Sequence, residues 1–240
     1  MQVSILAGKA AMLNEHISSA IDKRLIPKRQ FCDVTGLVED AQVSLQFHGG
    51  PERALHYYPR EHYSFWQSWF QGMGLNSAVS LFGPGAFGEN ISGVGLTEQD
   101  ACIGDIYRLD DALIQISQPR SPCYKLNARF GCDFFSVVVQ ANGRTGWLLR
   151  VLETGEVGPE ATLTLEDRPH PQMTVKRAGD IVFNQAFSPD GLQELATLAG
   201  LSPSWQQKAK DYLAAGQVTD WSMRLLGPSP KGCGQPFPYG

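Results

Sequence analysis

The sequence predicts a mainly β protein of the α+β class, in which a barrel or curved sheet with helical inserts precedes a small three-helix domain. From residue 1 to about 165, short β-favouring runs alternate with turns that contain Gly and Pro. After Pro169 and Pro171 the apolar residues recur at helical spacing instead. We therefore expect a barrel domain over residues 1–168 and a helical domain with an irregular tail over residues 169–240.

Four runs are expected to be barrel strands, because β-branched and other apolar residues dominate them and turn formers bound them. One helical insert is expected over 59–71, where Tyr63, Trp66 and Phe70 share a broad face and Pro59 suits a first turn. The apolar face of this helix should pack on the sheet. The four expected strands are 3–6, 112–116, 147–151 and 162–165.

Three amphipathic helices are expected in the second domain, over about 175–182, 192–199 and 205–213. Each is too short to be stable alone, so they should bundle together or pack against the barrel. The helix ends carry the usual start and stop signals. Capping serines stand before first-turn prolines, and glycines that can adopt the left-handed conformation follow the helices. These signals are Ser188-Pro189, Ser202-Pro203, Gly200 and Gly216.

The composition excludes several classes of protein. Of the 240 residues 42% are apolar, which supplies an ordinary globular core. The 20 basic and 24 acidic residues give a net charge of −4, which argues against a surface built to hold nucleic acid. The N-terminus lacks the pattern of a signal peptide, and no apolar run approaches the roughly 20 residues that span a bilayer. We expect a cytoplasmic protein with neither a membrane nor a nucleic-acid partner.

The five cysteines, at positions 32, 102, 123, 132 and 233, are widely spaced and include no Cys-x-x-Cys pair. This spacing fits neither a disulfide framework nor a zinc or iron–sulfur site. We expect free thiols, of which at most one or two serve in chemistry.

Cys123 has the most reactive setting of the five. It follows a predicted strand and two prolines, precedes a short helical stretch, and is flanked by Arg120 and Lys125. Nearby positive charge favours the thiolate, which binds a soft metal or attacks an electrophile. The residues alone leave open a buried structural cysteine in a Pro-rich turn.

Three further loops are rich in residues that suit a ligand: 48–51, 56–62 and 83–90. The glycines of 83–90 allow backbone N–H groups to approach a ligand closely, and Asn90 offers both a donor and an acceptor. Taken singly, each loop fits an ordinary turn or a solvated helix start better than a ligand site. A lone histidine such as His48 is more often structural than functional.

Taken together, these segments resemble the MOSC domain, in particular its bacterial YiiM-type members, and the likeness covers nearly the whole chain. The C-terminal helices and the ending at 220–227 look like that subfamily's three-helix domain. One departure is Glu39, in a Gly-Leu-Val-Glu-Asp run where the family has a second glycine, so a local change in that turn is expected while Asp40 is kept. The segments that carry the resemblance are 48–55, 58–63, 85–91 and 118–126, of which the last is the most specific.

The resemblance implies that the protein binds molybdenum cofactor (molybdopterin), with Cys123 as the molybdenum ligand. It also implies the reduction of small N-hydroxylated compounds, including hydroxylaminopurine-type base analogues. His48 and His56 are candidate proton donors, because histidine titrates near neutral pH. The candidate cofactor-binding residues are Arg53, Arg60, Arg120 and Lys125 for the phosphate, and Gly49, Gly50, Gly88 and Asn90 for the pterin.

The electron source is expected to be a separate reductase, a flavoprotein by class. The chain has neither a Gly-x-Gly-x-x-Gly opening after a strand nor iron–sulfur spacing, so it should not take electrons from a nicotinamide unaided. Two other readings stay open at this point. The protein could carry the cofactor, or sulfur as a persulfide on Cys123, without turnover, or it could be a Cys–His hydrolase that needs no metal.

Overall fold

The computed structural model describes residues 1–227 apart from 14, 16, 42–48 and 185. His48, Cys233 and the tail expected to be irregular therefore lie outside the described residues. Within the described part, no helix has the length and apolar character required to cross a membrane.

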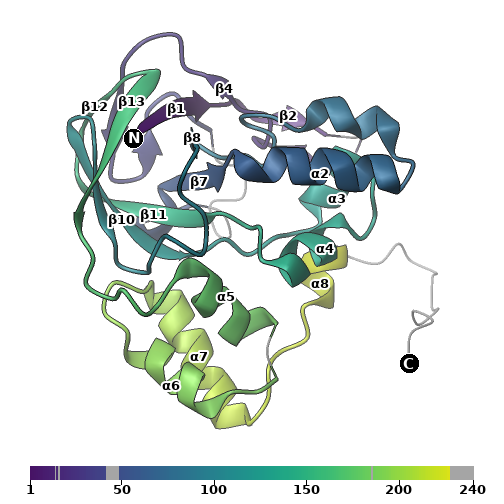
Figure 1. The fold of residues 1–240 in the computed structure, drawn as a ribbon, viewed down its shortest axis with the longest axis vertical. Helices are drawn as coiled ribbons and strands as arrows, with labels where there is room; N and C mark the ends of the chain where they lie inside the picture. The colour runs from purple at the N-terminus through teal and green to yellow at the C-terminus, as the bar shows by residue number, and fades with distance from the viewer. Residues whose placement is uncertain (14, 16, 42–48, 185, 228–240) are drawn as a thin grey trace.

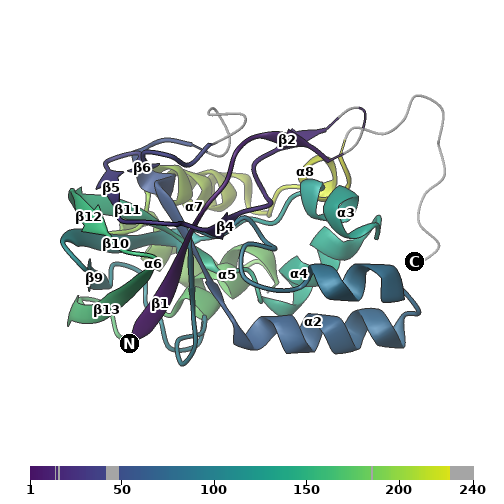
Figure 2. The ribbon, with the colours of Figure 1, turned by 90° about the horizontal axis from the view of Figure 1, so that it is seen from above.

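Within the described residues, seven strands form a closed barrel (Figures 1 and 2), which confirms the predicted fold class. Closure occurs at the first strand, where Val3 pairs with Ala161 on one side and with Gly93 on the other. Around the barrel the order is β1 (Gln2–Ala7), β13 (Glu160–Asp167), β9 (Ile106–Leu109), β10 (Ala112–Pro119), β11 (Trp147–Glu153), β7 (Leu55–Pro59) and β8 (Ile91–Gly93). Only the pair β7–β8 is parallel among these neighbours.

All four predicted strands are confirmed, as parts of β1, β10, β11 and β13. Nine shorter strands were not predicted, because runs of two to five residues are too short to show a period. Three of them, β7, β8 and β9, belong to the barrel, and the others are β2 (Ala11–Met12), β3 (Ser18–Ser19), β4 (Arg24–Leu25), β5 (Gln30–Asp33), β6 (Gly36–Leu37) and β12 (Gly155–Val157).

The predicted helical insert is α2 (Glu61–Gly72), which buries Tyr63, Trp66 and Phe70 as expected. The prediction that Pro59 begins this helix is wrong. Pro59 is the last residue of β7, because pairing with Gly93 of β8 extends the strand. The other helices of this region are η1 (Pro51–Arg53), η2 (Asn76–Leu81), α3 (Lys125–Phe130) and α4 (Phe135–Asn142).

The three C-terminal helices are confirmed as α5 (Val175–Phe183), α6 (Pro189–Thr197) and α7 (Pro203–Ala215), and α8 (Ser222–Leu226) follows them. Ser188 and Ser202 cap α6 and α7, each just before a proline in the first turn. Gly216 closes α7 with a φ of 65°. Gly200 also has a positive φ, but it does not close α6, because that helix ends at Thr197 and Leu198 is already extended.

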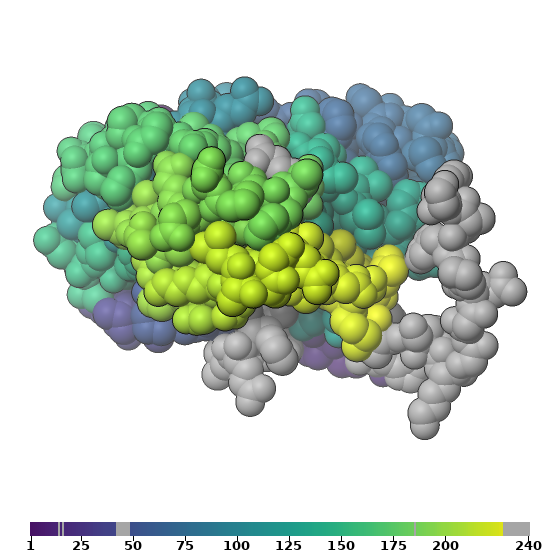
Figure 3. Space-filling view, turned by 90° about the horizontal axis from the view of Figure 1, so that it is seen from below, coloured from purple at the N-terminus to yellow at the C-terminus, as the bar shows by residue number. Residues whose placement is uncertain are grey.

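The helices pack directly on the barrel and share one hydrophobic core with it. Ser202 reinforces the contact, because its N–H donates to the carbonyl of Ser117 at 2.9 Å and its hydroxyl donates to Oε1 of Gln118 at 2.7 Å. Figure 3 shows these helices as a continuous green and yellow surface over this face of the molecule. The hydrophobic core therefore continues past residue 168.

Candidate functional site

A pocket of about 120 Å³ lies beside Cys123, where the end of β10 meets the loops before β7 and β8. Of the described residues that line it, four are basic and none is a carboxylate. This charge balance suits an anionic ligand. The lining is Ser19, Ala20, Ile21, Lys23, Ala41, Arg53, His56, Phe87, Gly88, Asn90, Arg120, Cys123, Lys125 and Leu148.

Cys123 reaches the pocket because β10 ends at Pro119 and the chain turns before α3. The turn is held at both ends. The N–H of Arg120 donates to the carbonyl of Gly146 at 3.1 Å, and that of Leu126 donates to the carbonyl of Cys123 at 3.0 Å. Cys123 is half-buried and forms no disulfide with another described cysteine. Cys32, Cys102 and Cys132 are buried elsewhere, and burial raises the pKa of each of these thiols, which favours the unreactive form.

Arg120 is the basic residue most clearly prepared for a ligand. Its Nη2 donates to the carbonyl of Phe87 at 3.3 Å, whereas its buried Nη1 has no hydrogen-bond partner among the described residues. Burial lowers the pKa of Arg120, and the nearby Cys123 acts in the opposite direction. A buried donor without an acceptor is costly, so this N–H group fits an anionic oxygen supplied by a ligand.

Lys125 and Arg53 also line the pocket, as predicted for phosphate binding. The ammonium group of Lys125 donates to the carbonyl of Ser18 at 3.2 Å, which fixes the side chain across the pocket wall. Burial lowers the pKa of Arg53, and Glu52 acts against this shift.

Lys23 is a pocket residue that sequence analysis missed. It forms an ion pair with Asp40, and the two side chains are only 6% and 3% exposed. Burial lowers the pKa of Lys23, and the carboxylate of Asp40 opposes that shift. No motif surrounds Lys23 in the sequence, so its place in the site depends on contacts with residues far along the chain.

Asn90 and Gly88 line the pocket, but most of their hydrogen-bonding groups have partners within the protein. The amide of Asn90 donates to the carbonyl of Leu6 at 3.2 Å and to Asp40 at 2.9 Å, and its oxygen accepts from the N–H of His56 at 3.2 Å. The N–H of Gly88 donates to the carbonyl of Gly85 at 3.1 Å. These groups shape the pocket wall and leave little capacity for a pterin.

The Gly-rich loop is organised around the buried carboxyl of Glu89. The N–H groups of Gly85 and Phe87 donate to it at 2.6 and 2.9 Å, and the hydroxyl of Tyr63 donates as well. Burial raises the pKa of Glu89, and these hydrogen bonds oppose that shift. Gly85 has a φ of 92°, and a Cβ there would overlap the carbonyl oxygen of Lys23, so only glycine fits.

His56 lies in the pocket as predicted, but its surroundings do not suit a charged proton donor. The side chain is 6% exposed, and its Nε2 lies 3.4 Å from the carbonyl of Thr145. Burial lowers the pKa of His56 well below its usual value of 6.5, and the charges of Arg120 and Lys23 lower it further. The imidazole is therefore neutral near pH 7.

Three predicted residues are not brought into the pocket, and His48 is outside the described residues. Arg60 bonds instead to Ser4 and, at 3.3 Å, to Ser92 on neighbouring barrel strands. Gly49 and Gly50 precede η1 and do not line the pocket in the described part of the chain. Arg60 directly follows β7 and is the N-cap residue of α2.

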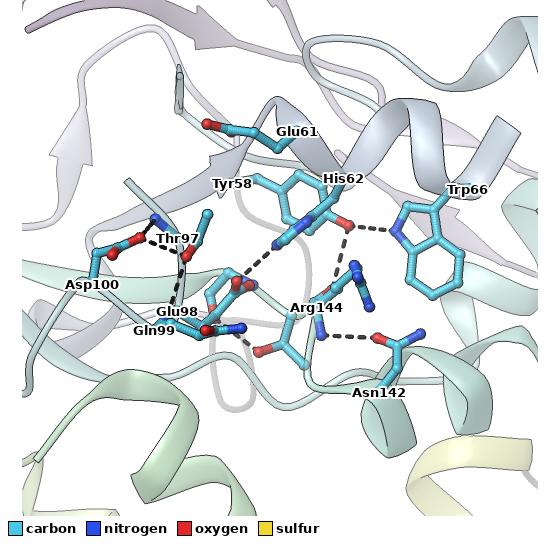
Figure 4. A network of polar contacts seen from close by, with 12 residues as sticks. Tyr58, Glu61, His62, Trp66, Thr97, Glu98, Gln99, Asp100, Asn142 and Arg144 are labelled. Atoms are coloured by element: carbon cyan, nitrogen blue, oxygen red, sulfur yellow. Dashed lines mark hydrogen bonds and ion pairs between the residues drawn. The ribbon is translucent and has the colours of Figure 1, made fainter. Parts of the chain in front are cut away.

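A buried polar network supports the loop between α4 and β11 (Figure 4). Nε2 of His62 lies 2.7 Å from Oε2 of Glu98, and Oε1 of Glu98 accepts from the N–H of Gly146 at 2.7 Å. The hydroxyl of Tyr58 accepts from Trp66 at 2.7 Å and donates to the carbonyl of Arg144 at 3.3 Å. Since Gly146 in turn binds the backbone of Arg120, the network fixes one side of the site.

Glu39 leaves the site intact. Its exposed side chain accepts from Gln30 at 3.2 Å, while Asp40 accepts from the N–H of Gly8 at 2.8 Å and holds Lys23. Asp110 is the only non-glycine residue with a positive φ in the described part, so residue 39 does not need glycine's conformational freedom.

Arg224 of α8 is a second residue that sequence analysis missed near Cys123. Its side chain donates to the carbonyl of Pro122. Burial lowers the pKa of Arg224 to about 10, and Cys123 acts in the opposite direction. The segment 220–227 was recognisable in the sequence as a family-like ending, but no local pattern indicated that it returns to the thiol.

The site has one thiol and basic groups but no protein cage for a metal ion. Among the described residues, no three His, Cys, Asp or Glu side chains gather in a way that could hold one. A molybdenum ion at Cys123 would therefore take its remaining ligands from its organic cofactor. The buried, unpaired Nη1 of Arg120 and the carboxylate-free lining fit the phosphate of such a cofactor.

Barrel, pocket and helices define a recognisable class of protein, and the chain belongs to the MOSC family. The model of the MOSC domain matches residues 44–164. A second model, the YiiM-like 3-alpha helix domain, matches residues 173–216.

Relatives extend this match over almost the whole chain. The protein YiiM of Escherichia coli strain K12 is 40% identical over 225 residues, which are 94% of this chain and 98% of that one. The crystal structure of YiiM from Escherichia coli superimposes with a TM-score of 0.79 at 37% identity, covering 95% of this chain and 100% of that one. A protein of Gibberella moniliformis named "Reductase" is 36% identical over 191 residues, 79% of this chain but 33% of its own length.

Proposed function

We propose that this protein binds molybdenum cofactor and reduces N-hydroxylated compounds such as hydroxylaminopurine-type base analogues. The observation that carries the proposal is the pocket itself, in which one cysteine, Cys123, lies among basic side chains without a carboxylate. Membership of the MOSC family supports the cofactor, and the name of the fungal relative supports a reductive reaction.

The residues of the pocket divide the work of binding. Cys123 supplies a thiolate, the soft donor that molybdenum prefers. Arg120, Arg53 and Lys125 neutralise the phosphate of the cofactor, and Lys23, paired with Asp40, lies on the same wall. Phe87 forms the aromatic side of the pocket.

The proposed reaction converts R–NH–OH, two electrons and two protons into R–NH2 and water. Bound molybdenum supplies the change between two oxidation levels that differ by two electrons. His56 is held neutral, so a charged imidazolium is not expected to protonate the leaving hydroxyl near pH 7. We expect the electrons to come from a separate flavoprotein reductase. Protein loaded with cofactor should then fail to oxidise NADH or NADPH at the rate of substrate reduction.

The decisive experiment compares Cys123→Ser with Cys132→Ser, both purified from a host that makes the cofactor. Serine is close in volume but is a harder donor that stays protonated near neutrality, so Cys123→Ser should lose molybdenum and activity while its circular dichroism is unchanged. Cys132 is buried in the aromatic core, so its variant should lose some stability but keep molybdenum. Activity is measured with a hydroxylaminopurine and a chemically reduced viologen dye.

Three results would contradict the proposal. A folded Cys123→Ser protein with undiminished molybdenum and activity would show that Cys123 is not the metal ligand. Wild-type protein that binds the cofactor tightly but never turns over would be a carrier. Wild-type protein without molybdenum that hydrolyses esters or amides would be a Cys–His hydrolase.

A further inference from the structure

The last described segment of the chain returns to the loop that presents Cys123. After the three-helix region, residues 221–227 cross to the barrel domain, and α8 lies beside α4 (Figures 1 and 3). About 100 residues of sequence separate this segment from Cys123, and none of its residues lines the pocket.

Backbone carbonyls of α8 accept hydrogen bonds from both helices that follow Cys123. The N–H of Tyr124 donates to the carbonyl of Arg224 at 2.9 Å. The carbonyl of Leu225 accepts from Nδ2 of Asn127 at 2.9 Å and from the hydroxyl of Ser136 at 2.5 Å. The segment is therefore bonded to the residue directly after Cys123, to α3 and to α4.

The side chain of Arg224 secures the residue directly before Cys123. Its Nη1 donates to the carbonyl of Pro122 and its Nη2 donates to Oε1 of Gln140. The guanidinium group lies 4.8 Å from the ring centre of Trp221 and 5.1 Å from that of Phe183 on α5. A planar fork that bonds two acceptors and stacks on rings at once is a property of arginine, which lysine does not share.

We infer that residues 221–227 form a clasp that positions the Cys123 loop for its metal, with Arg224 as the positioning residue. The inference rests on the proposed role of Cys123 as a molybdenum ligand. Residues that bond to a ligand-bearing segment orient the ligand without touching the metal. The clasp also gives the C-terminal helices a function at the site, because Phe183 of α5 packs against the guanidinium group that holds the loop.

The test compares Arg224→Ala and Arg224→Lys with Arg177→Ala in the full chain. Arg177 is a matched control, because it bonds to Gln172 at 3.0 Å and Glu194 at 2.7 Å within the helical region and is 42% exposed. Hydrogen exchange of the Tyr124 and Leu126 amides reports the position of the loop whether or not molybdenum is bound. Molybdenum retention after dialysis, and thiolate-to-metal absorption per retained molybdenum, report its effect on the site.

In Arg224→Ala, exchange at Tyr124 and Leu126 should rise by about tenfold relative to β10 and α7. Molybdenum affinity should fall by roughly tenfold, and the absorption band should shift. Arg224→Lys should resemble Arg224→Ala, since one ammonium group cannot replace the fork. Arg177→Ala should match the wild type in all three measurements.

Several outcomes would overturn the clasp. These are unchanged exchange at the two amides, a rise shared equally by β10 and α7, or faster exchange without loss of molybdenum. If Arg224→Lys matched the wild type in all three measurements, the guanidinium group would not be required to hold the loop. If wild-type protein held no molybdenum, the proposed function would fail, and the exchange measurements would still decide whether α8 holds the loop.

Discussion

The two hydrophobic cores of the described chain differ in composition and in what they border. The larger core is mainly aliphatic and runs from inside the barrel, through residues such as Ile114 and Leu163, into the C-terminal helices at Leu192 and Trp205. The smaller core is mainly aromatic and lies among α2, α3, α4 and the Gly-rich loop. Its buried rings belong to Tyr58, Tyr63, Trp66, Phe70, Phe82, Phe87, Phe130 and Phe135.

The larger core, the frame, stabilises the fold, whereas the smaller core, the wall, shapes one side of the pocket. Aliphatic side chains fill the barrel at high density and join it to the helices, so the larger core holds the fold. Aromatic rings are rigid plates, and the smaller core stacks them, with 4.1 Å between the ring centres of Tyr58 and Phe87 and 4.4 Å between those of Phe82 and Phe130. Because Phe87 also lines the pocket, the aromatic core fixes the shape of the site.

The largest expected effect concerns the shared core. Trp205 is 1% exposed and lies where the helices meet the barrel, so Trp205→Ala should lower the free energy of unfolding by about 3–5 kcal/mol. Because the core is continuous, barrel and helices should still unfold in one transition. Urea denaturation followed by circular dichroism and by hydrogen exchange in β10 and α7 measures this. Two separate transitions would show that the helices form an independent core.

A change in the aromatic core should lower the free energy of unfolding less than Trp205→Ala does, but it should reduce molybdenum retention. Phe87→Leu removes the stacking on Tyr58 and should lower the free energy of unfolding by about 1–2 kcal/mol, with a severalfold loss of molybdenum on dialysis. Ile114→Val, fully buried in the barrel core, is the matched control and should cost about 1 kcal/mol without loss of molybdenum. Equal retention in both variants would break the distinction between frame and wall.

A pH effect of about 1 kcal/mol is expected from His56, which is buried in the lining of the pocket. Its pKa is lowered in the folded protein, so below its usual value of 6.5 the unfolded chain binds a proton that the folded chain does not. The free energy of unfolding should therefore fall by about 1 kcal/mol between about pH 7 and about pH 5.5. In His56→Gln this contribution should be absent. Parallel pH profiles for the two proteins would show that His56 titrates normally.

The smallest effect is expected at Glu39, which is exposed and outside both cores. Glu39→Gly restores the family's residue but removes only the contact with Gln30. The free energy of unfolding should change by about 0.5 kcal/mol or less, and molybdenum content should be unchanged. A large gain in either quantity would mean that Glu39 distorts the Asp40 turn.

Local patterns in the sequence determined the fold class, the four long strands, α2 and the three C-terminal helices. Alternation, helical spacing and capping residues act over a few positions, so they can be read without knowledge of the tertiary structure. The family-like segments likewise marked Cys123, Arg53, Arg120 and Lys125, all of which line one pocket. The short strands and the true start of α2 were missed, because their hydrogen bonds come from distant partners.

Only the tertiary structure decided which charges surround the thiol and how they are used. Arg60 is directed to the barrel strands, whereas Lys23 and Arg224 come close to the site, which no local pattern in the sequence indicated. The low pKa of His56 likewise arises from burial beside two cations brought together by folding. The physical reason is that hydrogen bonding, burial and Coulomb interactions depend on separation in space, which the order of residues along the chain does not specify.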